Sequence, residues 1–253
     1  MPTLIELETP EANIEFCREL GLGLLEINMN LPYFQLEGLR NLRVENDIRY
    51  SLHLPEELNV WDFNDRIGGA YLDTVCETIE IAKEKGIKIL NMHMNPGVYF
   101  TLPESRVFLF EQNFQHYISK TEAFAREMAS LLKNTGIRIF IENTGINDLA
   151  FITAAVESLL MYDCFALTWD VGHDYSSGNK DLGFLKENKD RICHLHLHDA
   201  IGERNHLSLG EGDINIEEIF SLASGCESII LETKTAEALK ISVDYFRSMS
   251  SIS

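Results

Sequence analysis

The stretch HLHLHDAIGERNHLSLGEGD, residues 194–213, places four histidines within thirteen residues, and three of them alternate with leucine. Successive side chains of a β-strand point to opposite faces, so His194, His196 and His198 would share one face and the leucines the other. Imidazole binds divalent metal ions and transfers protons near neutral pH. The stretch therefore predicts a strand whose polar face carries a metal site or an acid–base site.

Polar side chains also end several other β-like runs, beside apolar neighbours that would face the opposite way. With His196 included, the set comprises His53, His93, Glu142, Asp170, His196 and Glu232. Three carboxylates gathered in one pocket repel each other unless a positive charge lies among them. A divalent cation supplies that charge, and a mixed set of carboxylate and imidazole ligands suits Mn, Zn, Co or Fe better than Ca. We therefore expect these side chains to surround a divalent metal ion.

A regular alternation of short β-like runs and helical stretches must position these residues. The β-like runs are 4–7, 24–28, 48–53, 87–93, 137–142, 165–170, 192–198 and 228–232. Residues 66–85 and 105–134 carry apolar side chains at steps of three and four, which is typical of amphipathic helices. Thr9, followed by proline, and Asn215 are typical residues for the start of a helix.

Eight strands alternating with helices predict one domain, residues 1–253, folded as a single (β/α)8 TIM barrel. A doubly wound open sheet is the alternative, but no G-x-G-x-x-G sequence follows any of the predicted strands. The C-terminal ends of barrel strands face one cavity, where barrel enzymes hold their catalytic groups. In this fold the polar strand ends would meet in that cavity.

The composition restricts the partners and the compartment. Hydrophobic residues make up 45% of the chain, enough for a large core, and the net charge of −19 disfavours nucleic acid as a partner. The five cysteines are scattered without a C-x-x-C pair, as expected for free thiols in a reducing cytosol. No signal-peptide pattern is visible, and Glu157 and Asp163 interrupt the most apolar window, 149–169. We therefore expect a cytoplasmic protein that does not enter a membrane.

Several motifs resemble those of one enzyme family. They are IENTG (141–145), WDVGHDYSSG (169–178), HLHDA (196–200), HLSLGEGDIN (206–215) and ILET (230–233), with HLP (53–55) and HMNPG (93–97) as looser matches upstream. In this order they are similar to the xylose isomerase-like TIM barrel superfamily. That group includes sugar and sugar-phosphate isomerases and epimerases and is related to endonuclease IV. The motifs are specific for the superfamily but not for one reaction.

The resemblance implies a role for each residue of the site. A divalent ion (Mn, Zn or Co) would be held by Glu142, Asp170, His196 and Glu232. Glu142 and Glu232 would also act as the acid and base that pass a proton between two substrate carbons, through an enediolate. Contacts with the substrate would come from His53, His93, His173, Arg204 and His206. One ion per chain is expected, and two is the alternative, because His53 and His93 exceed the needs of a one-metal site.

The implied function is a metal-dependent isomerase or epimerase of carbohydrate metabolism that acts on a small-molecule sugar or sugar phosphate. The alternatives are an endonuclease IV-like phosphodiesterase (an AP endonuclease), a dehydratase or lyase on the same scaffold, and a barrel that binds a ligand without catalysis. Arg204 counts against the endonuclease, because that family has a metal-binding aspartate at the corresponding position. A homo-oligomer is compatible with the resemblance, since dimers and tetramers are frequent among similar barrels.

Five further residues have less specific interpretations. His194 is expected to be a hydrogen-bonded interior residue, and His116 to be solvated on a helix. His198 either supports the metal ligands or lies at the surface. Gly210 and Gly212 would first of all shape the turn before the next helix, although such a turn can also receive an anion such as phosphate.

Overall fold

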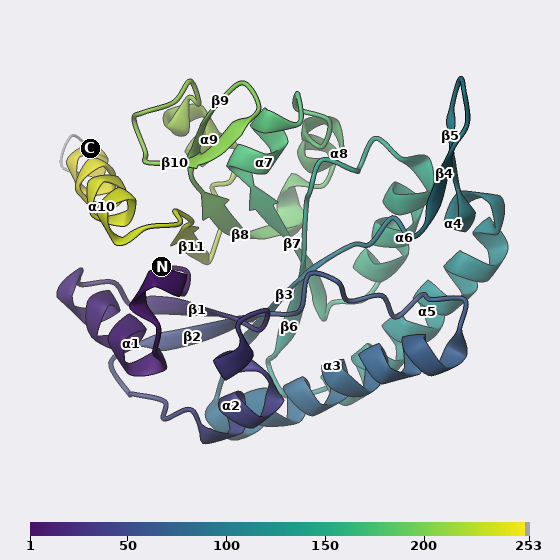
Figure 1. Cartoon of the computed structure of the whole chain (residues 1–253), viewed down its shortest axis with the longest axis horizontal. Helices are drawn as coiled ribbons and strands as arrows, with labels where there is room; N and C mark the ends of the chain where they lie inside the picture. The colour runs from purple at the N-terminus through teal and green to yellow at the C-terminus, as the bar shows by residue number, and fades with distance from the viewer. Residues whose placement is uncertain (251–253) are drawn as a thin grey trace.

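The computed structural model describes residues 1–250, and seven parallel strands form the central sheet within them. They are β1 (Leu24–Asn28), β2 (Arg49–His53), β3 (Ile89–His93), β6 (Arg138–Glu142), β7 (Phe165–Asp170), β8 (Ile192–Leu197) and β11 (Ser228–Leu231). Their order in the sheet is their order along the chain, and β1 approaches β11, so the sheet curls into a nearly closed barrel (Figure 1). The expected TIM barrel fold is therefore confirmed.

The strand predicted at 4–7 is wrong. Ile5–Leu7 form a 3-10 helix (η1), and the chain before it pairs with β1 through a parallel bridge between Pro2 and Glu26 and a hydrogen bond from the Met1 amino group to the Leu24 carbonyl. Leu4 leaves the sheet because the side chain of Asn13 bonds its backbone. The Leu4 N–H donates to Asn13 Oδ1 at 2.7 Å, and Asn13 Nδ2 donates to the Leu4 carbonyl at 3.4 Å. These backbone groups are then unavailable to a neighbouring strand.

Helices cover the outside of the barrel (Figure 1). They are α1 (Pro10–Glu19), α2 (Leu36–Asn41), α3 (Asp65–Lys85), α4 (Leu109–Gln112), α5 (Phe114–Leu131), α6 (Ala150–Leu160), α7 (Val171–Ser176), α8 (Leu182–Glu187), α9 (Ile216–Leu222) and α10 (Ala236–Ser250), with short 3-10 helices η2 (Pro32–Phe34) and η3 (Lys189–Arg191). The helix predicted at 66–85 is confirmed as α3. Thr9 and Asn215 cap α1 and α9, as the sequence predicts. Within residues 1–250, no helix combines the length and hydropathy that crossing a bilayer requires.

The helix predicted at 105–134 is confirmed only from Leu109 onward. Its first residues form β5 (Arg106–Phe108), which pairs with β4 (Tyr99–Thr101) in an antiparallel hairpin that projects from the barrel (Figure 1). Asn113 then separates the short α4 from the long α5. Val107 fits the helical repeat by its spacing, but pairing with β4 engages its backbone in a strand.

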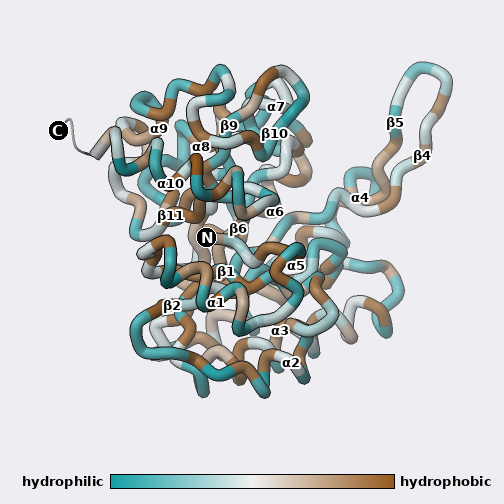
Figure 2. The backbone as a smooth tube through the Cα atoms, turned by 60° about the vertical axis from the view of Figure 1, so that its left-hand side comes forward, coloured by the Kyte–Doolittle hydropathy of each residue, from teal (hydrophilic) through white to brown (hydrophobic). Residues whose placement is uncertain are grey.

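Alternation along the strands separates an apolar shell from a polar interior. In β8, Leu195 and Leu197 belong to the hydrophobic core beneath the helices, whereas His194 and His196 are buried inside the barrel. Hydrophobic and hydrophilic residues alternate along the outer helices (Figure 2), as expected for elements with one buried face. Buried polar residues from the other strands share the interior with these histidines: Glu26, Ser51, Asn91, Glu142, Thr168 and Asp170. Such groups are tolerated inside a protein only when they find partners.

Candidate metal centre

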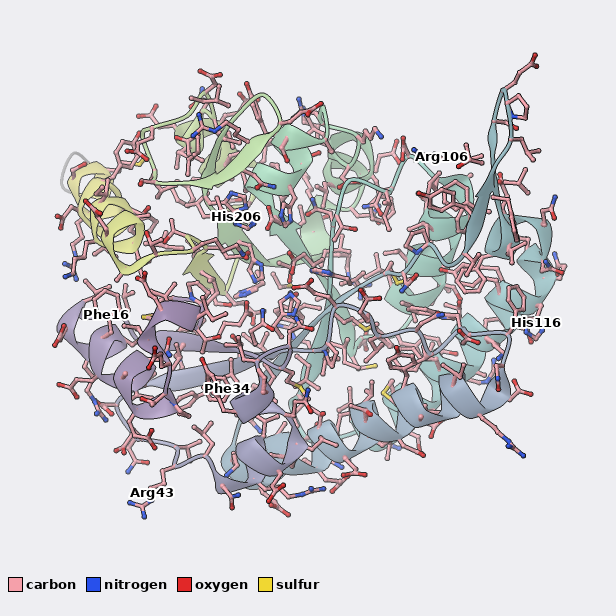
Figure 3. The ribbon with its side chains drawn as sticks, viewed as in Figure 1. Phe16, Phe34, Arg43, Arg106, His116 and His206 are labelled. Atoms are coloured by element: carbon pink, nitrogen blue, oxygen red, sulfur yellow. The ribbon has the colours of Figure 1, made fainter. Side chains whose placement is uncertain are left out.

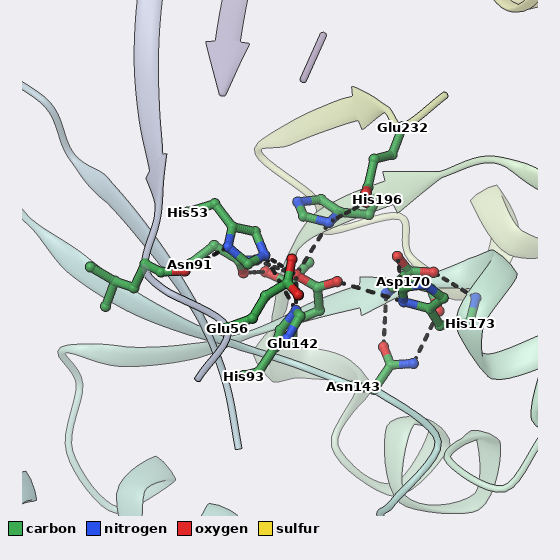
Figure 4. A network of polar contacts seen from close by, with 12 residues as sticks. His53, Glu56, Asn91, His93, Glu142, Asn143, Asp170, His173, His196 and Glu232 are labelled. Carbon is green, nitrogen blue, oxygen red and sulfur yellow. Dashed lines mark hydrogen bonds and ion pairs between the residues drawn. The ribbon is translucent and has the colours of Figure 1, made fainter. Parts of the chain in front are cut away.

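The C-terminal ends of four strands bring together the four predicted metal ligands. Glu142 ends β6, Asp170 ends β7, His196 lies on β8, and Glu232 follows β11. One ligand atom from each of them lies within 4.8 Å of the others. His196 Nδ1 lies 3.2 Å from Glu142 Oε2 and 2.9 Å from Glu232 Oε2 (Figure 4). The strand register that the sequence predicted therefore brings these ligand atoms close enough together to share one metal ion.

Unpaired polar atoms at this cluster fit a bound cation. Asp170 Oδ2, His196 Nδ1 and Glu232 Oε2 are buried and make no well-aligned hydrogen bond within the described chain, although His196 Nδ1 lies 2.9 Å from Glu232 Oε2 and His173 Nδ1 lies 3.2 Å from Asp170 Oδ2. Buried polar atoms in native proteins almost always make a hydrogen bond. A divalent ion would satisfy all three at once, and their mixed oxygen and nitrogen character suits a transition metal. The residues present therefore fit the ion that the family resemblance implies.

A second group of ligand atoms shares Glu142 with the first. Nε2 of His53 and Nε2 of His93 lie 3.4 Å and 3.3 Å from Glu142 Oε2, and 3.3 Å from each other. Nδ1 of His53 lies 2.8 Å from the carbonyl of Leu54, so that nitrogen can donate its proton there and leave Nε2 directed at the cluster. Burial disfavours the charged imidazole, but Glu142 outweighs burial and raises the pKa of His53 to about 9. A protonated His53 thus provides positive charge that a second ion could replace.

Two asparagines that the sequence analysis did not identify hold the carboxylate ligands. Asn91 Nδ2 contacts Glu142 Oε2, while Thr168 Oγ1 donates to Asn91 Oδ1 at 2.6 Å. Asn143 bonds the backbone of Asp170 twice: its Oδ1 accepts from the Asp170 N–H at 2.7 Å, and its Nδ2 donates to the Asp170 carbonyl at 3.0 Å. Asn143 lies within the IENTG motif, and Asn91 lies two residues before His93. These positions were the available signals, because Asn91 shares a strand face with His93 and Asn143 directly follows Glu142.

Glu26 is a third residue that sequence reasoning missed. It is only 3% exposed, and its Oε1 lies 3.1 Å from His196 Nε2, on the side of the ring away from Glu142 and Glu232. Ser51 Oγ donates to Glu26 Oε2 at 3.2 Å. An acid inside the apolar run LLEIN was the available signal, because burying an unpaired carboxylate is costly.

The remaining histidines divide into the site, its surroundings and the surface. His173 Nδ1 lies 3.2 Å from Asp170 Oδ2, and the ring of His206 lies beside the rings of His173 and His198. Burial, with help from His198, lowers the pKa of His206 to about 4. His194 is an interior residue whose Nδ1 lies 2.6 Å from Ser228 Oγ, as expected.

Two other predictions concern positions outside the cluster. His116 is exposed on α5, far from the strand ends, as the sequence indicated (Figure 3). Arg204 is exposed where β10 (Arg204–Leu207) begins, in a hairpin with β9 (Asp199–Ile201). Its predicted contact with the substrate stays a prediction.

The turn at Gly210 and Gly212 wraps around a carboxylate of the chain itself. The two glycine N–H groups donate to Asp199 Oδ2 at 3.0 and 2.9 Å. A Cβ atom at Gly212 would lie 2.1 Å from Asp199 Oδ1, so only glycine fits there. Turn shape therefore accounts for these glycines, and the amides that could receive an external anion are already engaged.

Comparison with known proteins identifies the family of the chain. Residues 14–249 match the model of a protein family described as "Xylose isomerase-like TIM barrel". An uncharacterized protein of Methanocaldococcus jannaschii is 26% identical over 244 residues, which are 94% of this chain and 89% of that protein.

Two solved structures superpose on almost the whole chain. One, described as a D-tagatose 3-epimerase-like protein, gives a TM-score of 0.75 at 21% identity and covers 99% of this chain and 97% of the other. The other, a protein from Thermus thermophilus soaked with ZnCl2, gives a TM-score of 0.70 at 19% identity and covers 100% and 97%. At these identities both structures show a shared fold.

Proposed function

Because the chain belongs to the xylose isomerase-like TIM barrel family, we propose that it is a sugar or sugar-phosphate isomerase or epimerase that depends on a divalent metal ion. The observation that carries the proposal is the convergence of Glu142 and Glu232 on His196 Nδ1, with Asp170 completing the set. Two carboxylates beside one ion site are what a proton transfer between neighbouring carbons requires. The fold shared with a D-tagatose 3-epimerase-like protein supports this choice of reaction.

In this proposal Glu142, Asp170, His196 and Glu232 hold the ion. Bound there, a divalent cation would polarise the carbonyl and hydroxyl oxygens of an α-hydroxy ketone and lower the cost of the enediolate. Burial raises the pKa of both carboxyls, but His196 outweighs burial and lowers the pKa of Glu142 and of Glu232 well below the ordinary value. Both are therefore ionised. One carboxylate would remove a proton from carbon and, now a carboxylic acid, would return it to the neighbouring position. Epimerisation would require the other carboxylate first to take up a proton from solvent and then to deliver it to the opposite face.

A small cavity beside Glu232, lined by both apolar and polar side chains, is a suitable place for the sugar. Its volume is about 170 Å³, and it lies between the N-terminal residues, β1 and the chain after β11. Thr3, Asn28, His53 and Lys234 line it together with Glu232. Hydroxyl, amide, imidazole and ammonium groups are what a polyhydroxylated substrate can hydrogen-bond. We expect His93, His173, Arg204 and His206 to contact other parts of the substrate.

The same proposal includes the setting of the enzyme. We propose a single domain that works in the cytoplasm on a small molecule, without a nucleic acid or membrane partner, as the net charge of −19 and the composition favour. A homo-oligomer is compatible with it.

A metal-dependent phosphodiesterase is the second candidate, and one observation favours it. His53, His93 and Glu142 form a second group of ligand atoms next to the first, and two neighbouring ions are typical of hydrolases that cleave phosphate esters. The strongly negative charge of the chain counts against a DNA substrate, and Arg204 stands where the endonuclease family has a metal-binding aspartate. A dehydratase or lyase would use the same glutamates on a substrate with a better leaving group.

Metal content and turnover test the proposal together. Protein purified without chelator or metal-affinity tag should contain about one Mn, Co or Zn ion per chain by elemental mass spectrometry. It should interconvert a ketose with its epimer or aldose, lose this activity on chelation, and regain it with added ion. A protein without bound ion or without activity on any ketose, or one that nicks abasic DNA instead, would contradict it.

A further inference from the structure

Three histidines form a cluster whose ring nitrogens could be taken for another metal site. One nitrogen of each of His173, His198 and His206 lies within 4.8 Å of the others. The hydrogen bonds of two of these rings decide what the cluster does.

Both ring nitrogens of His198 are already engaged. The backbone N–H of His206 donates to His198 Nδ1 at 2.7 Å. An amide can only donate, so Nδ1 is the acceptor and the proton of the neutral ring is on Nε2. His198 Nε2 lies 3.0 Å from Asp170 Oδ1 and therefore donates to that carboxylate. His198 is completely buried and has no nitrogen left for a metal ion.

His206 is similarly committed on one side. Its Nδ1 lies 3.1 Å from the backbone carbonyl of Glu232, so this nitrogen carries the proton and donates it. The backbone of His206 is left-handed, with φ of 55°. That conformation is rarely adopted by residues other than glycine, and it accompanies an N–H that points at His198. The cluster therefore joins the β9–β10 hairpin to two of the proposed ligands instead of forming a three-histidine site.

The other contacts of Asp170 complete the arrangement. Its Oδ1 also accepts the backbone N–H of His173 at 2.7 Å, so both donors bind the same oxygen. Oδ2 makes no well-aligned hydrogen bond within the described chain, and His173 Nδ1 lies 3.2 Å from it. Asp170 contributes one carboxylate oxygen to the proposed metal cluster. Two hydrogen bonds on Oδ1 thus restrict the rotation of the carboxylate and leave Oδ2 available.

Gly172 provides the space in which the His198 ring lies. A Cβ atom at position 172 would lie 2.0 Å from Cε1 and 2.1 Å from Nδ1 of His198. Any other residue would displace the ring. The glycine in the sequence DVGH is therefore explained by the histidine that lies against it.

We propose that His198 is a positioning residue, which accepts the His206 N–H at Nδ1 and donates from Nε2 to Asp170 Oδ1, so that Asp170 Oδ2 is aimed at the metal ion. Hydrogen bonds of this kind to metal ligands typically change metal affinity by about 10- to 100-fold. The inference rests on the proposed function, because it needs a divalent ion at Asp170.

Two substitutions separate the halves of this role. The side-chain oxygen of His198→Asn can occupy the place of Nδ1 and accept from His206, but the donor to Asp170 is lost. The amide nitrogen of His198→Gln can occupy the place of Nε2 and donate to Asp170, but the acceptor for His206 is lost. The two variants are otherwise similar in polarity, so each is the control for the other.

Titration of the metal-free proteins with Co²⁺, followed by visible absorption and calorimetry, is the decisive experiment. We expect His198→Asn to bind Co²⁺ about 10- to 100-fold more weakly than the wild type, with an altered absorption spectrum. His198→Gln should stay within about threefold of the wild type and keep its spectrum. Equal affinity and an unchanged spectrum for His198→Asn, or an equal loss in both variants, would overturn the inference and leave the proposed function intact. A wild-type protein that binds no Co²⁺ would overturn both.

The protonation of the wild-type ring provides a measurement that does not depend on how the variants fold. In the metal-free protein, ¹⁵N-resolved NMR spectra should show His198 with a proton on Nε2 and an unprotonated Nδ1. A proton on Nδ1 would overturn the inference.

Discussion

Glu26 Oε1 lies 3.1 Å from Nε2 of His196, and the opposite nitrogen of the same ring faces the two candidate catalytic glutamates. A neutral imidazole that binds a metal through Nδ1 must carry its proton on Nε2. A carboxylate beside that proton stabilises this tautomer and makes the metal-bound nitrogen more basic. Glu26 is therefore placed to orient His196 from inside the barrel.

The first prediction concerns this carboxylate. Glu26→Ala should weaken binding of Mn²⁺ or Co²⁺ by roughly 10- to 100-fold, because His196 loses its acceptor, whereas Glu26→Gln keeps a carbonyl oxygen there and should lose less. Calorimetric titration of the metal-free proteins measures the difference. Ser51→Ala, which removes only a hydroxyl donor to Glu26, is the control. Equal affinities for Glu26→Ala and the wild type would show that Glu26 has no such role.

A second prediction addresses the two candidate acid–base residues. Glu142→Gln and Glu232→Gln should each reduce turnover of the ketose substrate by roughly 10²- to 10⁴-fold, because the amide cannot accept the proton. Glu203→Gln makes the same chemical change at an exposed position on the β9–β10 hairpin and should leave the turnover rate unchanged. Steady-state rates with each variant saturated with metal provide the comparison. Full activity in either of the first two variants would exclude that glutamate from the proton transfer.

The third prediction distinguishes one ion from two. Because His53 and His93 direct Nε2 at Glu142, zinc in excess should show a second, weaker binding event in the wild type. His93→Ala should lose that event and keep the first within about threefold. His116→Ala removes an exposed imidazole from α5 and should leave both events in place. A single event in the wild-type titration would argue against the second site and against the hydrolase.

The fourth prediction is a pH dependence of stability. Burial and the nearby Asp181 raise the pKa of Asp174 to about 6 in the folded protein, above the ordinary value of about 3.9 in the unfolded chain. Between these values the folded state binds more protons, so this group makes the protein less stable as the pH rises from about 4 to about 6. Asp174→Asn removes the buried charge and keeps an oxygen that can accept the Asp181 N–H.

Asp174→Asn should therefore unfold in urea with a free energy about 1–3 kcal/mol larger than that of the metal-free wild type at pH 7.5, and with little difference near pH 4. Asp181→Asn is the contrast. Asp181 accepts the N–H groups of Gly145 and Asn147 at 2.6 and 2.8 Å with its two carboxylate oxygens, so an amide in its place should make the protein less stable. A stability difference for Asp174→Asn that does not change with pH would refute the assignment.

The barrel and the meeting of the polar strand ends could be predicted because both follow from strand register, whereas the choice of four of these residues as ligands came from the family resemblance. Alternation within a strand decides which side chains face inward, and the barrel decides that the strand ends meet. The absence of a strand at 4–7 could not be predicted from those residues alone, because it depends on Asn13, whose side chain bonds the backbone of Leu4. The hairpin at 99–108 was missed because an apolar residue at helical spacing is equally compatible with a strand, and its pairing with β4 decides between the two.

The supporting residues were harder to predict than the ligands. Glu26, Asn91 and Asn143 act through contacts with residues far away in sequence, and of the three only Asn143 lies within a motif. His198 had two interpretations that the sequence could not separate. The bonds to His206 and Asp170 resolve them in favour of support for the site.

The position of His196 between Glu26 and Glu232 links the site to the closure of the barrel. Glu26 lies on the first strand of the sheet and Glu232 directly follows the last, so the ring of His196 spans the seam where β1 approaches β11. A nascent chain still lacking β11 has an incomplete ligand set, however well its first strands have folded. The proposed four-ligand site would therefore be complete only once β11 is in place, and an ion bound at the seam would oppose the separation of the first and last strands.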